Sequence, residues 1–234
     1  MGQLCSQSKP GNAEGAAAGF VAVYGMPISG NVIPSVLLAM DLGVGKMEFK
    51  DMLKGELKTP EMLAINPWGQ MPSMKDGDFC LAEGNAILRY IANKHAPDRY
   101  GGSDIKKKAT IDWALDWAST NFIKQYEGIW YPTAGFLPAP ADQKAVNAAA
   151  IENMGKFEKL FLAKTKFVAG DVPSIADYKI AVLFWYLDFE AIREQRDGFE
   201  LPARIKTYVK DFMDSSKSQE FLAGATDFMA SLKK

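Results

Sequence analysis

Residues in the first half of the chain have the types and spacing to bind a small peptide. Pro72 follows Gln70 and Met71 at the start of a short predicted strand. A proline has no N–H to give to a sheet, so it belongs at an edge or entry point, where backbone groups of the residue before it stay free for a ligand. Glu83 then opens a helical pattern. A carboxylate beside a helix N-terminus and free backbone groups can hold an α-amino acid group.

The residues around these groups predict the elements that position them. Asp76-Gly77 is the signal of a tight hairpin, and Phe79 and Leu81 alternate as in a half-buried strand. A helix is predicted over 83–95, because apolar residues recur there at helical spacing. These apolar positions are Ala86, Ile87, Tyr90 and Ile91.

The preceding segment predicts a strand, a helix and a second strand. Residues 20–24 form a β-rich apolar run, and residues 32–42 show helical periodicity up to Gly43, which is typical of a helix end. Residues 47–49 follow as a second predicted strand, and a polar loop is expected between that strand and the hairpin.

The run GELKTPEMLAINPWGQMP, from Gly55 to Pro72, closely resembles the GEHKxPEFLxxNPxGQVP run of soluble glutathione transferases, especially the phi-like and related bacterial classes. The resemblance implies an α/β thioredoxin-like N-terminal domain followed by an all-α C-terminal domain. It also implies that glutathione is the co-substrate, that Pro72 is cis, and that Met71 bonds the cysteinyl part of glutathione through its backbone. Lys58 would meet the glycyl carboxylate. The glutathione-binding residues expected on this basis are Lys58, Gln70, Met71, Pro72, Glu83 and Gly84.

Ser29 and Asn31 are the candidate catalytic residues, because they directly precede the first predicted helix. Activating glutathione requires a thiolate near neutral pH, although an ordinary thiol has a pKa of about 8.5. A hydroxyl donor and the positive end of a helix can supply that stabilisation. Ser29 is the first choice and Asn31 the second, and Tyr24 at the end of the first strand competes with both. No cysteine occurs in this segment, which argues against the omega, lambda and dehydroascorbate-reductase-like branches of the family.

Three positions depart from the family pattern. The Glu-Ser or Asp-Ser pair that normally holds the γ-glutamyl group is Glu83-Gly84 here, so one hydroxyl is missing. Leu57 stands where a histidine is common, and Pro34 occupies a position that is often basic. These changes would weaken glutathione binding, or mark a member that no longer catalyses.

The expected domain organisation has four parts. Residues 1–19 are a flexible extension, 20–97 a thioredoxin-like glutathione-binding domain, 98–104 a linker, and 105–234 an all-helical domain. Within the last part, Ser174-Ile175-Ala176-Asp177 resembles a helix-start element of these transferases and can act as a capping box. An aromatic stripe there is a candidate for the hydrophobic substrate site. Its residues are Trp113, Trp117, Phe122, Tyr126 and Trp130.

Composition excludes several classes of partner. A formal net charge of −1, with 27 basic and 28 acidic residues, argues against nucleic acid. No metal is expected, because Cys5 and Cys80 form no CxxC pair and His95 is the single histidine. The longest convincing apolar run, 180–187, is too short to cross a membrane.

The first six residues fit a lipidation signal. Gly2 and Ser6 match the myristoylation pattern, and Cys5 is placed for palmitoylation. One acyl chain binds a membrane only marginally, whereas two anchor stably. A cytoplasmic protein on the cytosolic face of a membrane is therefore expected.

Two functions follow from these observations. The first is a homodimeric transferase that joins glutathione to hydrophobic electrophiles through a stabilised thiolate. The alternative is a non-catalytic, transferase-like binding or scaffold protein that is tethered to a membrane.

Overall fold

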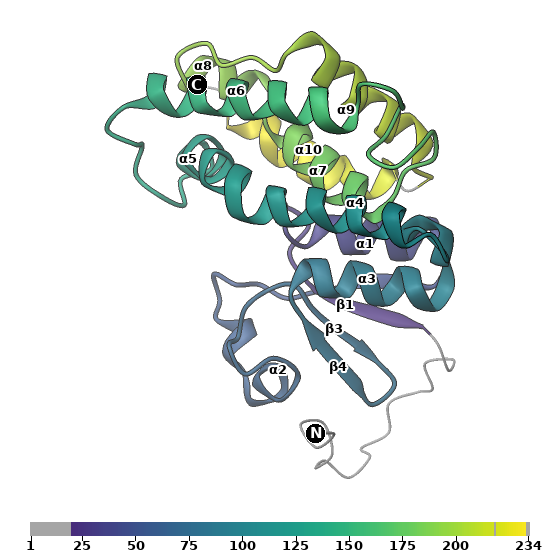
Figure 1. Cartoon of the computed structure of the whole chain (residues 1–234). Helices are drawn as coiled ribbons and strands as arrows, with labels where there is room; N and C mark the ends of the chain where they lie inside the picture. The colour runs from purple at the N-terminus through teal and green to yellow at the C-terminus, as the bar shows by residue number, and fades with distance from the viewer. Residues whose placement is uncertain (1–19, 218, 233–234) are drawn as a thin grey trace. The chain divides into compact units, whose positions relative to one another are not determined.

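The computed structural model describes residues 20–217 and 219–232. It divides into two compact units, the first ending at Ala96 and the second beginning at Pro97. We call them the N-terminal unit and the helical unit (Figure 1).

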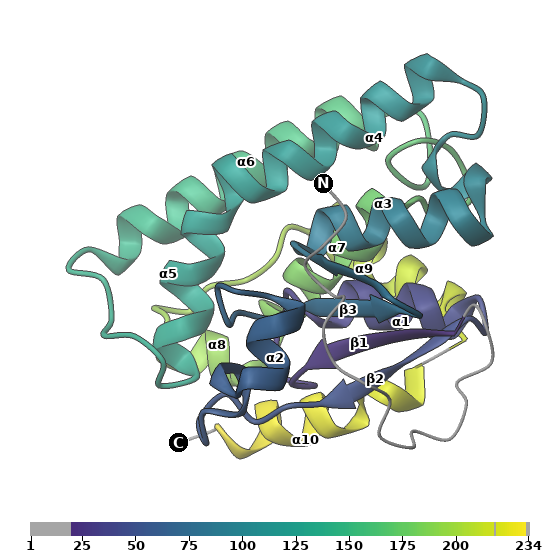
Figure 2. The same cartoon turned by 90° about the horizontal axis from the view of Figure 1, so that it is seen from below.

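A four-stranded sheet of order β2-β1-β3-β4 forms the centre of the N-terminal unit (Figure 2). β1 (Val21–Gly25) pairs in parallel with β2 (Gly45–Phe49). β3 (Ser73–Asp76) pairs antiparallel with both β1 and β4 (Phe79–Ala82). The mixed sheet is that of a thioredoxin-like domain, so the predicted α/β N-terminal fold is confirmed.

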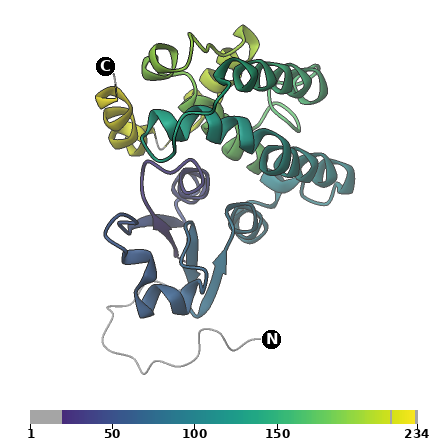
Figure 3. The ribbon, with the colours of Figure 1, turned by 90° about the vertical axis from the view of Figure 1, so that its left-hand side faces the viewer.

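Helices cover both faces of this sheet (Figure 3). α1 (Ile33–Asp41) and α3 (Gly84–His95) pack on one face, whereas α2 (Pro60–Ile65) lies on the other. The segment 60–65 was expected to be loop. It forms a helix because Thr59 caps it, its hydroxyl accepting from the Met62 N–H at 3.4 Å, and because a proline fits the first helical position.

Helices joined by loops make up the second unit in its described residues, which confirms the predicted all-α fold of this part. Its longer helices are α4 (Ile105–Trp117), α5 (Ile123–Thr133), α6 (Gln143–Phe161), α7 (Ile175–Tyr186), α9 (Ala203–Ser215) and α10 (Ala223–Ser231). Shorter ones are η2 (Pro97–Tyr100), the π-helical turn η3 (Ala118–Phe122), α8 (Glu190–Gln195) and η4 (Gln219–Leu222). Within the described ranges, no helix has the length and apolarity needed to cross a membrane.

Asp177 in the first turn of α7 is the polar centre of the helical unit. The side chain is fully buried, and its carboxylate accepts four hydrogen bonds. They come from the N–H of Val168 (2.9 Å), the N–H and hydroxyl of Ser174 (2.7 Å each) and the hydroxyl of Tyr208 (2.9 Å). Asp177 therefore reaches back to Ser174, as the sequence predicted, and also fixes the loop before α7 and helix α9.

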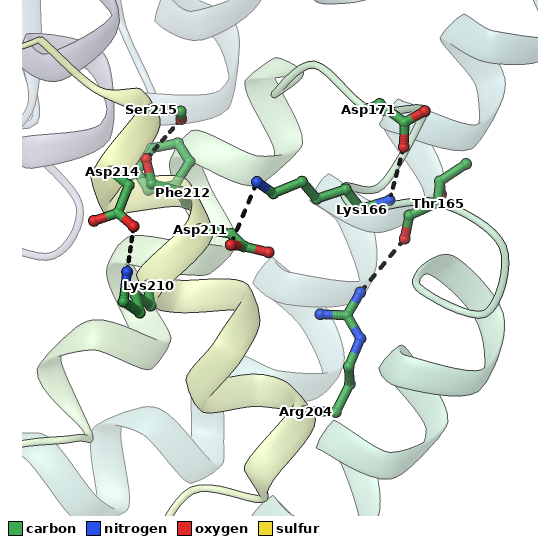
Figure 4. Close-up of polar contacts among 9 residues, drawn as sticks. All are labelled: Thr165, Lys166, Asp171, Arg204, Lys210, Asp211, Phe212, Asp214 and Ser215. Atoms are coloured by element: carbon green, nitrogen blue, oxygen red, sulfur yellow. Dashed lines mark hydrogen bonds and ion pairs between the residues drawn. The ribbon is translucent and has the colours of Figure 1, made fainter.

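Partly exposed side chains also contact the loop before α7 (Figure 4). Lys166 pairs with Asp211 of α9 at 3.3 Å, and its backbone N–H donates to Asp171. Arg204, also on α9, donates to the carbonyl of Thr165 at 3.4 Å. Such partly exposed contacts contribute little individually, so we attribute most of the loop's order to the buried carboxylate of Asp177.

Candidate active site

Ser29 lies in the turn that leads from β1 into α1. Its carbonyl accepts hydrogen bonds from the N–H groups of Val32 (2.9 Å) and Ile33 (3.0 Å), so the residue sits directly at the N-terminal end of the helix. The side chain is partly exposed, and its hydroxyl has no hydrogen-bond partner among the described residues. Asn31 is also partly exposed and occupies the same turn. A hydroxyl that is free to donate beside a helix N-terminus is suited to stabilising an anion.

Met71, which lies just before β3, has free peptide groups. The bond between Met71 and Pro72 is cis, as the resemblance implied. Within residues 20–217 and 219–232, neither the N–H nor the carbonyl of Met71 makes a hydrogen bond. Gln70 before it is exposed, and Pro72 after it is buried. Unpaired peptide groups beside the start of a strand can hydrogen-bond an extended peptide.

Glu83 has an uncommon backbone conformation for a residue with a side chain. Its φ is 68° and its side chain is exposed. Its carbonyl accepts from the N–H of Ile87 at 2.9 Å, so Glu83 directly precedes α3. Such conformations cost about 1–3 kcal/mol and concentrate at functional sites. The carboxylate is thereby placed at the helix N-terminus, where the sequence predicted it.

Gly84 lies against the turn that carries Asn31. A Cβ atom at this position would be 3.2 Å from the Asn31 carbonyl oxygen and 3.6 Å from Cγ of Pro72. The Ser35 hydroxyl donates to the Gly84 carbonyl at 3.5 Å. The structure therefore brings the turn before α1, the cis proline and the start of α3 together.

Lys58 contacts the loop before β3. Its Nζ donates to the Trp68 carbonyl at 2.7 Å. Gly69 has a φ of 56°, and a Cβ there would be 2.6 Å from Cδ of Lys58. Leu57, at the position where the family often has histidine, points into the core, where it is 3% exposed.

Tyr24, the competing catalytic candidate, lies within the sheet. It stands in register with Glu48 of β2 and Ser73 of β3. Burial raises the pKa of its hydroxyl, and the nearby carboxylates of Glu48 and Glu61 add to that effect. Tyr24 would therefore act only as a neutral donor.

The aromatic stripe proposed for the hydrophobic substrate is mostly the core of the helical unit. Phe122, Tyr126 and Trp130 are at most 1% exposed, and Trp117 is 9% exposed. Trp117 stacks on Phe122 and on Phe157, Phe122 contacts Phe184, and both Tyr126 and Trp130 contact Tyr186. Trp113 alone of the five is largely exposed, at 54%. The helical spacing of the stripe therefore reflects packing for four of its members, and Trp113 remains available to a ligand or partner.

The comparisons with known proteins agree on one family. Residues 21–93 match the family model described as the glutathione S-transferase, N-terminal domain. The probable glutathione S-transferase GSTF2 of Oryza sativa subsp. japonica is 33% identical over 168 residues, covering 66% of this chain and 75% of the rice protein. The glutathione S-transferase 3 of Zea mays is 32% identical over 176 residues, covering 69% and 75%.

The chain belongs to the glutathione S-transferase family. The predicted family, fold class and enzyme class are thereby confirmed. Among solved structures, glutathione transferase F1 from poplar has a TM-score of 0.72 at 26% identity, covering 89% of this transferase and 99% of the poplar chain.

Sequence reasoning assigned no role to two buried polar residues of this transferase, Asn66 and Ser73. Both lie inside or beside the run that carries the resemblance, and both are buried although their side chains are polar. An asparagine before a proline, as in Asn66-Pro67, is a common turn signal. The sequence pattern alone therefore did not indicate that Asn66 has a role in the site.

Proposed function

We propose that this transferase conjugates reduced glutathione to hydrophobic electrophiles, with the hydroxyl of Ser29 stabilising the glutathione thiolate. The single observation that carries the proposal is that the Ser29 hydroxyl, unpartnered in the described chain, stands at the N-terminal end of α1, in the unit that also holds the free peptide groups of Met71.

In the reaction, the thiol loses its proton to solvent, and the thiolate sulfur attacks an electrophilic carbon. A C–S bond forms, and in a substitution the leaving group departs with its bonding electron pair. The Ser29 hydroxyl donates to the sulfur before attack, and the N-terminus of α1 adds favourable partial charge. Asn31, from the same turn, is the second candidate for this role.

The tripeptide would be held by groups on three segments. Glu83 pairs with the α-amino group, and the N–H of Gly84 donates to the γ-glutamyl carboxylate. The N–H and carbonyl of Met71 bond the cysteinyl unit, and Lys58 meets the glycyl carboxylate. Gln70 and Pro72 flank Met71 and shape the contact. Lys58 and Glu83 carry charges opposite to those of the glycyl carboxylate and the α-amino group. The arrangement therefore also selects the direction in which glutathione lies in the site.

The alternative function is that of a non-catalytic, transferase-like binding or scaffold protein that is tethered to a membrane. It is motivated by Gly84, Leu57 and Pro34, which replace a hydroxyl, a histidine and a frequent basic residue. Both Leu57 and Pro34 are buried, however. Their substitution would therefore change packing more than contact with a ligand, and the enzyme proposal is favoured.

The test is conjugation of a chloronitroaromatic substrate by the purified protein, followed by absorbance of the product. The enzyme proposal predicts turnover that saturates with glutathione and falls in Ser29→Ala. Glutathione binding by calorimetry without turnover, or no glutathione binding at all, would support the non-catalytic alternative instead.

A homodimer is the assembly we propose. Support comes from exposed apolar side chains on the helical unit, among them Trp113 on α4 and Leu160 on α6, which is 55% exposed, because apolar surface of this kind marks interfaces. Sedimentation analysis of the protein and of Trp113→Ser would test it. A monomer at micromolar concentration would contradict the proposal.

Attachment to the cytosolic face of a membrane is also proposed, from Gly2, Cys5 and Ser6. These residues lie outside the described part of the chain, and the proposal rests on their sequence pattern alone. Gly2→Ala should release the protein to the soluble fraction, and Cys5→Ser should leave weak, reversible binding. Equal solubility of all three proteins would contradict acylation.

A further inference from the structure

The loop between α2 and β3 is braced by one buried side chain, that of Asn66. Its Oδ1 accepts from the N–H of Trp68 at 3.2 Å, and its Nδ2 donates to the carbonyl of Gln70 at 2.9 Å. The backbone N–H of Asn66 bonds the Met62 carbonyl at 2.8 Å, which ties the residue to the last turn of α2. Asn66 therefore fixes both ends of the segment that precedes Met71.

Ser73, the first residue of β3, supplies a second brace. Its hydroxyl donates to the same Gln70 carbonyl at 3.0 Å and accepts from Nδ2 of Asn66 at 3.2 Å. Asn66 is 3% exposed and Ser73 is fully buried. The three groups form a closed triangle of hydrogen bonds, and within that triangle the Gln70 carbonyl receives two donors.

This triangle settles the orientation of the peptide unit that joins Gln70 to Met71. A carbonyl oxygen has two lone pairs, and both of those of Gln70 are occupied by interior donors. The Gln70 carbonyl thus points inward, and the N–H and carbonyl of Met71 are left without partners in the described chain.

We propose that Asn66 and Ser73 are positioning residues for the peptide backbone of glutathione: by holding the Gln70 carbonyl inward, they aim the N–H of Met71, on the opposite side of the same peptide plane, at the cysteinyl unit. The assignment rests on the proposed function. Neither side chain touches glutathione, so both residues act through Met71.

Asn66→Asp is the sharpest test, because the exchange keeps the size of the side chain. A carboxylate still accepts from Trp68, but it cannot donate to the Gln70 carbonyl and it attracts the Ser73 hydroxyl away from that carbonyl. Gln70 then loses both donors. We expect the KM for glutathione and its dissociation constant to rise about tenfold, and kcat at saturating glutathione to stay within about twofold. Ser73→Ala removes one donor and should raise KM about threefold.

The pH dependence separates positioning from a general structural effect. A protonated carboxyl group can donate to the Gln70 carbonyl as the amide does. Calorimetry of Asn66→Asp at decreasing pH should therefore recover part of the lost affinity relative to the unmutated protein at the same pH. A loop that had simply collapsed would show no such recovery.

Asn147→Asp is the matched control. Asn147 is also a buried asparagine, and its Nδ2 donates to a carbonyl, that of Arg196, at 2.9 Å, but it lies in the helical unit. We expect this variant to lose thermal stability and to keep its KM for glutathione.

Three results would overturn the assignment while leaving the proposed function intact. They are an unchanged KM in Asn66→Asp, an equal rise in KM in Asn147→Asp, and a loss of kcat as large as the change in KM. No glutathione binding by the unmutated protein would instead overturn the proposed function, and this assignment with it.

Discussion

Asp177 in the helical unit and the candidate site groups of the N-terminal unit differ in whether their hydrogen-bonding capacity is used. In the helical unit, the carboxylate of Asp177 is fully buried and accepts four hydrogen bonds. In the N-terminal unit, the hydroxyl of Ser29 and the peptide groups of Met71 have no partner in the described chain. Polar groups that are saturated and buried stabilise the fold, whereas groups left open at a partly exposed position are available to a ligand.

This contrast predicts that changes in the two units separate stability from activity. Variants of the saturated groups of the helical unit should lower the free energy of unfolding without changing glutathione kinetics. Variants of open groups should do the reverse.

The largest effect is expected from Asp177→Asn. The amide keeps one acceptor oxygen but places an NH₂ group against hydrogen-bond donors, which leaves buried groups unpaired. We expect a loss of about 3 kcal/mol in the free energy of unfolding, measured by denaturant unfolding. The KM for glutathione of the folded fraction should not change.

The same variant should also alter the dependence of stability on pH. Burial is the largest influence on Asp177, and it raises the pKa of the carboxyl group in the folded state despite the opposing hydrogen bonds. The native protein should then lose stability as the pH rises from the unfolded value of about 3.9 through the folded pKa. If Asp177→Asn shows the same slope in that window, another group is responsible.

The next effect is on rate, in Ser29→Ala. Loss of a hydrogen bond to a charged group is worth about 1.5–3 kcal/mol, so kcat should fall by about tenfold or more. The affinity for glutathione and the melting temperature should be nearly unchanged. If Asn31→Ala loses the rate and Ser29→Ala does not, the two roles are exchanged.

Glu83 allows stability and binding to be changed in opposite directions. Glu83→Gln should raise the dissociation constant of glutathione and leave kcat at saturation unchanged, because the carboxylate pairs with the amino group in ground and transition states alike. Glu83→Gly should weaken binding similarly but gain about 1 kcal/mol of stability, since glycine accepts a positive φ without strain. Calorimetry and thermal unfolding of both variants provide the measurements. Intact binding in both would remove Glu83 from the site.

The smallest effect concerns the missing hydroxyl at Gly84. We expect Gly84→Ser to bind glutathione about twofold to fivefold more tightly than Gly84→Ala, because both carry the Cβ that approaches the Asn31 carbonyl but only serine adds a donor. Comparing the two variants cancels the shared crowding. Equal affinities would show that the hydroxyl has no role here.

The sequence predicted most of the N-terminal unit because local signals and long-range packing agree there. The hairpin at Asp76-Gly77 and the helix that ends at His95 appear as expected, and the run from Gly55 to Pro72 identified the family. α2 was missed, since its six residues are too few to show periodicity. The bridging role of Asn66 was missed as well, because hydrogen bonds between residues that are several positions apart leave no spacing pattern.

The aromatic stripe is a pattern that the sequence showed clearly but could not assign to a role. Helical spacing of large side chains is the same whether the face packs on other helices or lines a ligand site. Only the burial of Phe122, Tyr126 and Trp130 in the structure assigned these residues to the core. Sequence patterns thus identify an apolar helix face, but not whether other helices or a ligand cover it.

The most direct test of the central claim is the pKa of bound glutathione. Ultraviolet absorbance of the thiolate can be followed against pH in the unmutated protein and in Ser29→Ala, at saturating glutathione. We expect a thiol pKa clearly below the ordinary value of about 8.5 in the unmutated protein, and a rise of about one unit or more in the variant. Identical titrations in the two proteins would contradict it.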